Sequence, residues 1–138
     1  MSRLIRNLNN KMRTPDSLFY SVHHLWTKPT SEGLWEAGIT DYAQDLLGDI
    51  VFIDAPAVGT LLVAGQPCGL VESVKTGSDL HALVDGIVVE INHDLINGPE
   101  LINEKPYQAW IFKFKPSDGE TEHKLLSAEA YQTLTSQL

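Results

Sequence analysis

Lys75 is the residue whose type and surroundings best suit a chemical role. The turn-forming residues Thr76-Gly77-Ser78 follow it, and a β-favouring stretch that begins at Leu70 precedes it. This pattern predicts a β-hairpin with Lys75 at its tip. A primary amine on a flexible four-carbon stem at such a tip is open to acylation. Spacing alone is much more typical of a solubilising surface charge, so it does not by itself identify a cofactor site.

Other residues that could do chemistry form weaker patterns. His23 and His24 are adjacent, and because neighbours on a strand point to opposite faces, the pair does not predict a metal site. The other three histidines show no ligand spacing. Cys68 is the single cysteine, so it cannot form an internal disulfide, and it is interpreted as a small buried apolar residue. With no nucleophile triad and no phosphate loop, the sequence predicts no enzymatic activity of its own.

The elements that must position Lys75 are mostly strands. Strands are predicted around residues 19–26, 34–39, 50–53, 82–84, 87–91 and 110–115. Asp85-Gly86 predicts a tight hairpin between two of them. Thr40 is the predicted N-cap of a short helix that stops at Gly48, residues 97–102 suggest a helical turn, and Ser127 begins a C-terminal helix. Strands at intervals of about eight to twelve residues are typical of a sandwich or barrel.

Composition restricts the partners. The 138 residues suit one domain, and a net charge of −8 argues against a nucleic-acid partner. No apolar run approaches the ~20 residues of a membrane helix. A lone cysteine suits the cytoplasm, and the acidic surface favours a monomer steered towards basic partners.

The N-terminus differs in charge from the rest. Residues 1–17 form a basic extension, interpreted as a short amphipathic helix or tail packed on the domain, with a targeting peptide as the alternative. Residues 18–138 form the domain.

Several motifs resemble one family. Glu72-Ser73-Val74-Lys75 followed by Ser78-Asp79-Leu80 is similar to the lipoylation segment of glycine cleavage system H proteins. Upstream, the run from Gly38 to Phe52 resembles the family's most recognisable stretch, at the same distance from the lysine, and the likeness extends from about Tyr20 to the C-terminus. Biotinyl domains share such a hairpin but usually carry methionines beside the lysine, where this chain has Val74 and Thr76.

The resemblance implies a fold and a function. The fold would be the mainly β, flattened barrel or sandwich hybrid of lipoyl-type domains, with short helices that include one at the C-terminus. Lipoic acid would be amide-linked to Lys75 by a lipoylating enzyme, and the chain would be a swinging-arm carrier rather than an enzyme. The arm would serve the glycine decarboxylase, the aminomethyltransferase and dihydrolipoyl dehydrogenase. A redox partnership of Cys68 with the arm is a minor hypothesis.

The flanks of Lys75 acquire roles from the same resemblance. Glu72 and Asp79 would bracket the tip and be recognised by the lipoylating enzyme, although ordinary solvated charge explains each of them equally well. Gly77 is interpreted as serving the backbone geometry of the tip.

One departure concerns the cargo. Where the family usually has His-Glu-Trp, this chain has His24-Leu25-Trp26. The missing carboxylate would suit a cationic aminomethyl group near the cleft in which the arm rests. Three functions therefore stay open: the glycine cleavage carrier, an H-like carrier for a heterodisulfide-reductase-like sulfur-oxidising complex, and an unmodified interaction module.

Overall fold

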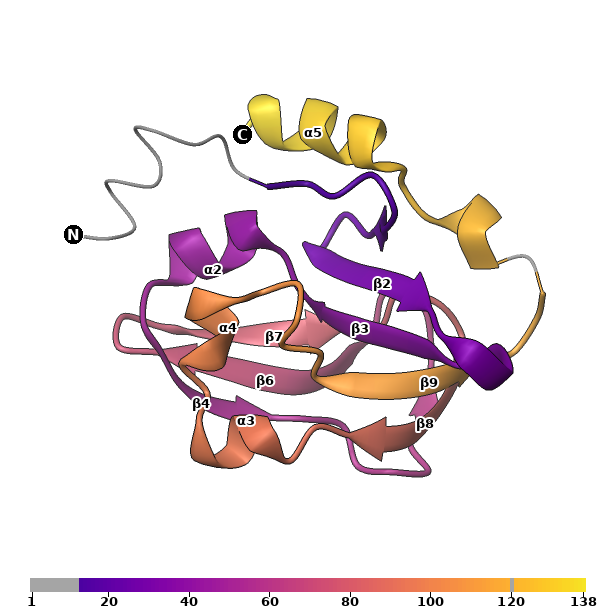
Figure 1. Cartoon of the computed structure of the whole chain (residues 1–138), viewed down its shortest axis with the longest axis horizontal. Coiled ribbons are helices and arrows are strands. Elements are labelled where there is room, and N and C mark those ends of the chain that lie inside the picture. Colours follow the sequence, from indigo (N-terminus) through magenta and orange to yellow (C-terminus); the bar gives the residue numbers. More distant parts are fainter. Residues whose placement is uncertain (1–12, 120) are drawn as a thin grey trace.

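Two antiparallel sheets form the framework of the computed structural model, which describes residues 13–119 and 121–138. The larger sheet has the order β1-β2-β3-β9-β8-β5 and the smaller the order β4-β6-β7. The strands are β1 (Phe19–Tyr20), β2 (Leu25–Pro29), β3 (Trp35–Ile39), β4 (Ile50–Asp54), β5 (Leu61–Leu62), β6 (Pro67–Ser73), β7 (Gly77–His81), β8 (Gly86–Ile91) and β9 (Phe112–Pro116). Figure 1 shows the smaller sheet lying across the larger one. The predicted mainly β fold is confirmed.

The main core is formed by apolar side chains from both sheets. Ala37, Val88 and Phe112 of the larger sheet and Val71 and Leu80 of the smaller sheet are each buried in one cluster. Alternation of buried and exposed residues along strands such as β8 gives each sheet one apolar face. The two sheets therefore share a sandwich core.

Short helices connect and flank the strands. They are α2 (Asp41–Leu47), α3 (Asp94–Asn97), α4 (Leu101–Glu104) and α5 (Ala128–Ser136), with 3₁₀ turns η1 (Ser31–Gly33) and η2 (Thr121–Lys124). Thr40 Oγ1 accepts from the N–H of Ala43, and Ser127 Oγ accepts from that of Ala130, so both predicted N-caps are confirmed. Gly48 ends α2 with a φ of 85°. The predicted C-terminal helix is α5, which packs beside β1.

The first predicted strand pair is interrupted. The chain turns at Ser21, and His24 adopts a φ of 68°, so β1 and β2 form one hairpin and β2 and β3 a second. Leu25 is the first residue of β2 rather than a mid-strand residue. His23 and His24 thus lie in a turn, and the alternation of faces along a strand does not apply to them.

The hairpin predicted at Asp85-Gly86 is wrong. The strand predicted at residues 82–84 does not form, because β7 ends at His81 and β8 begins at Gly86. These two strands do not pair with each other: β7 pairs with β6, whereas β8 pairs with β5 and β9. The chain crosses here from one sheet to the other. Asp85 Oδ1 accepts from the N–H of Ala64, and a Cβ on Gly86 would lie 2.5 Å from the carbonyl oxygen of Lys115. Asp85 therefore stabilises the crossing between the sheets, and Gly86 allows the close approach of β9, so neither residue forms a two-residue turn.

The start of the described chain is tied to the domain. The N–H of Arg13 donates to Asp41 Oδ2 over 3.1 Å, and Tyr107 Oη donates to the carbonyl of Arg13. Tyr20 Oη donates to the carbonyl of Pro15 over 2.7 Å. The helix and the targeting peptide considered for residues 1–17 fall largely on residues 1–12, outside the described part. Over residues 13–119 and 121–138, no helix is long and apolar enough to cross a membrane.

Candidate functional site

The β6–β7 hairpin places Lys75 at its tip, as predicted. Ser73 ends β6 and Gly77 begins β7, which leaves a three-residue turn between them. Ser73 Oγ accepts from the N–H groups of Lys75 and Thr76 over 3.2 and 3.1 Å, and the Ser73 N–H donates to the Thr76 carbonyl over 2.8 Å. This serine-based turn fixes the backbone from which the lysine projects.

The lysine side chain reaches the end of α2. Lys75 Nζ donates to the carbonyl of Leu46 over 3.1 Å, in the last turn of the helix, where carbonyls have no partner within the helix. A Cβ on Gly48 would lie 3.0 Å from Lys75 Cε, so the glycine leaves room for the lysine stem. This hydrogen bond is exposed, so the amine is accessible.

A bridge of hydrogen bonds holds the hairpin tip against the chain that follows α2. The N–H of Val74 donates to the carbonyl of Asp49 over 3.0 Å. Asn103 on α4 fixes that segment, because its Nδ2 donates to the carbonyl of Gly48 over 2.9 Å and its Oδ1 accepts from the N–H of Ile50 over 2.8 Å. The position of Lys75 thus depends on contacts with residues of α2, α4, β4 and β6.

Ser73 and Asn103 are supporting residues that sequence reasoning missed. A serine side chain often accepts a hydrogen bond from the backbone N–H two residues later in a turn, so the role of Ser73 could have been predicted from its place before Lys75. Asn103 is 28 residues from Lys75 and has no local signal, and only the tertiary structure reveals its contacts.

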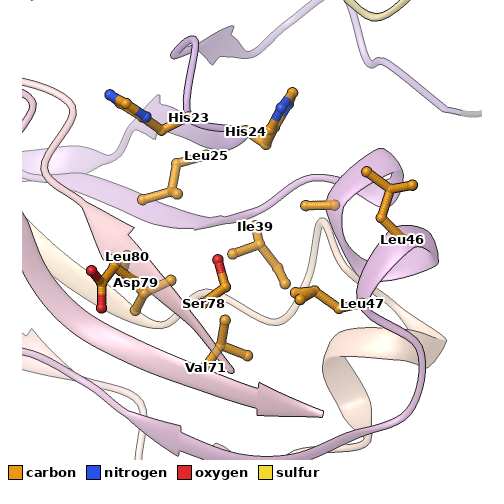
Figure 2. A pocket seen from close by; sticks show the side chains of 11 residues that line it. His23, His24, Leu25, Ile39, Leu46, Leu47, Val71, Ser78, Asp79 and Leu80 are labelled. Atoms are coloured by element: carbon orange, nitrogen blue, oxygen red, sulfur yellow. The ribbon is translucent and has the colours of Figure 1, made fainter. Parts of the chain in front are cut away.

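A small apolar pocket lies beside the tip. Its volume is about 130 Å³, and it lies between β2, β3, α2 and β7. The residues that line it are His23, His24, Leu25, Ile39, Ala43, Leu46, Leu47, Val71, Ser78, Asp79 and Leu80. Figure 2 shows Ser78 pointing into the pocket and Asp79 at its margin. Leu46 lines this pocket and also accepts the lysine hydrogen bond, so pocket and amine are contiguous.

The residues present fit an acyl arm with an apolar end. Lys75 offers an accessible amine for an amide bond, and the neighbouring pocket offers mainly apolar walls to a hydrocarbon chain and a dithiolane ring. Leu25 is 2% exposed and belongs to both the core and the pocket wall. No carboxylate therefore enters the pocket from this position.

Glu72, Gly77 and Asp79 share one side of the hairpin. Glu72 pairs with Gly77, and Leu70 pairs with Asp79, so the side chains of these four positions face the outer side of the smaller sheet. Glu72 and Asp79 are exposed and bracket Gly77. Gly77 has no positive φ, and a Cβ there would meet only ordinary contacts at 3.8 Å or more. Backbone geometry therefore does not require this glycine, contrary to the expectation from sequence.

Comparisons with known proteins agree with this geometry. Residues 18–138 match the family model described as glycine cleavage H-protein. The chain belongs to the glycine cleavage H-protein family. It is 59% identical to the glycine cleavage system H protein of Methylobacillus flagellatus, over 89% of this chain and 98% of the relative. It is 47% identical to that of Escherichia coli O7:K1, over 87% and 94% of the two chains.

A solved structure supports the same assignment. A glycine cleavage system H protein from Mycobacterium marinum is 38% identical, with a TM-score of 0.79 over 88% of this chain and 98% of that one. H proteins carry lipoic acid on a lysine and are carriers rather than catalysts, so the chain is a lipoate-carrying H protein. The sulfur-oxidation alternative is not favoured by these relatives.

The histidines of this H protein form two contacts at the mouth of the pocket. His23 and His81 stack with ring centroids 4.1 Å apart, a pairing that their spacing did not reveal. His24 Nδ1 lies 2.8 Å from Tyr131 Oη, which is also 2.8 Å from Thr40 Oγ1. Burial lowers the pKa of both His23 and His24. Among the described residues, no group of three or more histidine, cysteine or acidic side chains could hold a metal ion.

Cys68 lies on β6, half-buried against the core. Burial raises the pKa of its thiol to about 11. A thiolate is the reactive form of cysteine, so this residue is poorly suited to exchange with a dithiolane. The structural interpretation of Cys68 is therefore favoured over the redox hypothesis.

Proposed function

We propose that Lys75 is the lipoyllysine of this H protein. The observation that carries the proposal is its place at the tip of a hairpin whose backbone is held by Ser73, with an accessible amine beside an apolar pocket. Glu72 and Asp79, exposed on the same face, are the proposed recognition charges for the lipoylating enzyme. Gly77 keeps the surface between them open.

Attachment requires one acyl transfer. The lysine amine, once deprotonated, attacks the carboxyl carbon of an activated lipoyl ester or adenylate. A C–N amide bond forms, the bond to the activating group breaks, and the amine loses a second proton. The amide retains one N–H, which can still donate to the Leu46 carbonyl. The loss of the lysine charge makes the face around the tip more acidic.

The bound arm supplies two-electron dithiol chemistry, and the chain supplies position and protection. We propose that the pocket shields the apolar end of the arm between visits to partner enzymes. A tethered group would meet each active site at high effective concentration, so its cargo need not be released into solution between enzymes. With Leu25 in the wall, Asp79 at the margin is the one acidic residue among those that line the pocket, and we propose that it faces a cationic cargo on the arm.

The proposed partners are the glycine decarboxylase, the aminomethyltransferase and dihydrolipoyl dehydrogenase of the glycine cleavage system. Membership of the H-protein family implies these partner enzymes. The net charge of −8 supports encounter with basic rims around their active sites. A like-charged surface also favours a monomer, and the lone half-buried cysteine suits the reducing cytoplasm.

The glycine assignment is tested by exchange of bicarbonate into the carboxyl group of glycine. The lipoylated chain is mixed with glycine decarboxylase, and K75R prepared in the same way is the control. We expect exchange well above background for the wild type and background for K75R. Background exchange by a fully lipoylated wild type would eliminate the glycine assignment and return attention to sulfur cargo.

Leu25 is examined in the same assay. L25E places a carboxylate in a wall that is 2% exposed, so it costs stability unless the group reaches the pocket. L25Q is the matched uncharged control. If the missing acid weakens handling of the aminomethyl group, L25E raises the exchange rate above L25Q at equal folded fraction. Equal rates would mean that the missing acid does not matter.

A further inference from the structure

The outer face of the smaller sheet carries exposed apolar side chains beside Lys75. On β4, Ile50 and Ile53 are buried, whereas Val51 and Phe52 are 54% and 48% exposed. The register of β4 on β6 shifts between Ile50 and Phe52, which is the mark of a β-bulge. A bulge breaks the alternation of faces, so two consecutive side chains face outward here. Val74 in the hairpin tip is 68% exposed.

The strand registers place acidic residues among these apolar ones. Glu72 pairs with Phe52 on one side and with Gly77 on the other. The next row joins Asp54, Leu70 and Asp79 in the same way. We call this surface the tip face, and its members are Val51, Phe52, Asp54, Leu70, Glu72, Val74 and Asp79. It carries three carboxylates and no basic side chain, and Lys75 follows Val74 directly.

An exposed apolar surface next to a modified residue has a specific consequence. Any enzyme that acts on the Lys75 amine must bring its active site to the hairpin tip, so its rim covers the adjoining side chains. Apolar groups that become buried there contribute affinity, and complementary charges contribute encounter rate and orientation. The rim that fits this face therefore combines apolar side chains with lysine or arginine.

We propose that the tip face is the docking surface for the lipoylating enzyme, which contacts it with an apolar and basic rim around its active-site entrance. The proposal rests on Lys75 being the modified residue. It assigns Val51, Phe52 and Val74 a binding role that sequence motifs around the lysine do not indicate, because two of them lie on a different strand.

The test compares two matched pairs of exposed valines in acylation by a lipoate ligase with ATP and lipoate. V51S/V74S alters the tip face, and V58S/V63S alters valines of similar exposure, 60% and 56%, elsewhere on the chain. We expect the first variant to raise the KM for the apo chain about tenfold with little change in kcat, and the second to change KM less than about twofold. Thermal unfolding checks that both variants fold.

A charge pair provides an independent arm. E72Q/D79N is compared with E122Q/E129Q, which removes two exposed acids near the C-terminus. We expect E72Q/D79N alone to raise KM several-fold and to flatten its dependence on salt.

Three outcomes would overturn the docking proposal. Equal KM values for the two valine pairs would do so, as would equal values for the two acid pairs. If the tip-face variants are lipoylated normally but fail with glycine decarboxylase, the face serves a cargo enzyme instead. Mass mapping of the wild type separates these results from failure of the proposed function: a wild type with no label on Lys75 contradicts the lipoyllysine assignment itself.

Discussion

Two sets of exposed apolar side chains lie in contrasting surroundings. One belongs to the tip face beside Lys75. The other, here called the far set, lies around β5 and β8, and its members are Val58, Leu61, Val63, Ile87 and Val89. Figure 1 shows the β6–β7 turn at one end of the molecule and the start of β8 towards the other. Phe52 pairs with Glu72 in the first set, whereas Ile87 pairs with Lys115 in the second.

The difference between the sets lies in what stands beside them rather than in their exposure. Leu61, at 77%, is more exposed than any valine of the tip face. What distinguishes the tip face is the turn that carries Lys75, whose backbone is held by several hydrogen bonds. The far set also adjoins a hollow, which Leu61, Ile87 and the exposed Lys115 line. Apolar exposure alone therefore does not mark a functional surface, and single exposed apolar residues are ordinary.

The largest expected effect is the difference in stability loss between one glycine near each set of exposed apolar side chains. G86A, next to the far set, places a Cβ 2.5 Å from the Lys115 carbonyl oxygen, whereas G77A meets only ordinary contacts. We expect G86A to lower the free energy of unfolding by about 3 kcal/mol and G77A by less than about 1 kcal/mol, measured by urea denaturation. Equal losses of stability would contradict the close approach of Gly86 to the Lys115 backbone.

The turn serines give the next contrast. S73A removes the oxygen that accepts from two backbone N–H groups at the tip. We expect it to slow acylation of Lys75 about tenfold and to cost about 1–2 kcal/mol of stability. S117A, beside the far set, is the control and should leave acylation unchanged. Normal acylation of a folded S73A chain would show that the amine does not need a fixed turn.

Two asparagines sharpen the comparison further. N103A breaks the bridge between α4 and the segment at Gly48, and N92A breaks similar bonds to the carbonyl of Trp110 and the N–H of Asp94. Each should cost about 1–2 kcal/mol in urea denaturation. Only N103A should also slow acylation, by about threefold, because only Asn103 supports the tip. A matching loss of acylation in N92A would contradict a local role.

The smallest expected effect concerns pH. Burial lowers the pKa of His24 in the folded state, so below its ordinary value of about 6.5 the unfolded chain binds a proton that the folded chain resists. The free energy of unfolding therefore has its full value above about pH 6.5 and decreases as the pH falls below the ordinary pKa of histidine. Asparagine tolerates the positive φ of His24 and does not titrate. Between pH 7.5 and 5.5, H24N should lose less stability than the wild type, by on the order of 0.2 M in urea midpoint. A steeper loss in H24N would refute this assignment.

Local patterns predicted the elements that depend on local chemistry. Thr40 and Ser127 as N-caps, Gly48 as the end of α2 and Lys75 at a hairpin tip each follow from a few neighbouring residues. The failures arose where distant contacts decide. Gly86 is required by a strand approach to Lys115, and no local pattern distinguishes that from a tight turn. The positive φ of His24 likewise appears only with its partner Tyr131, 107 residues away.

The site divides in the same way. Lys75, Glu72 and Asp79 belong to one local motif, so sequence reasoning found them together. The β4 bulge that turns Val51 and Phe52 outward, and the bridge through Asn103, depend on strand pairing and packing. Sequence reasoning therefore located the amine but not the surface and supports that surround it.

The most direct measurement of the central claim is peptide mapping by mass spectrometry of the chain after lipoylation. The sequence contains seven lysines, which provide six internal controls. We predict an amide-linked lipoyl group on Lys75 alone, and no label anywhere in K75R. A label on another lysine, or an unlabelled Lys75 when an authentic H protein is fully lipoylated in parallel, would contradict the account.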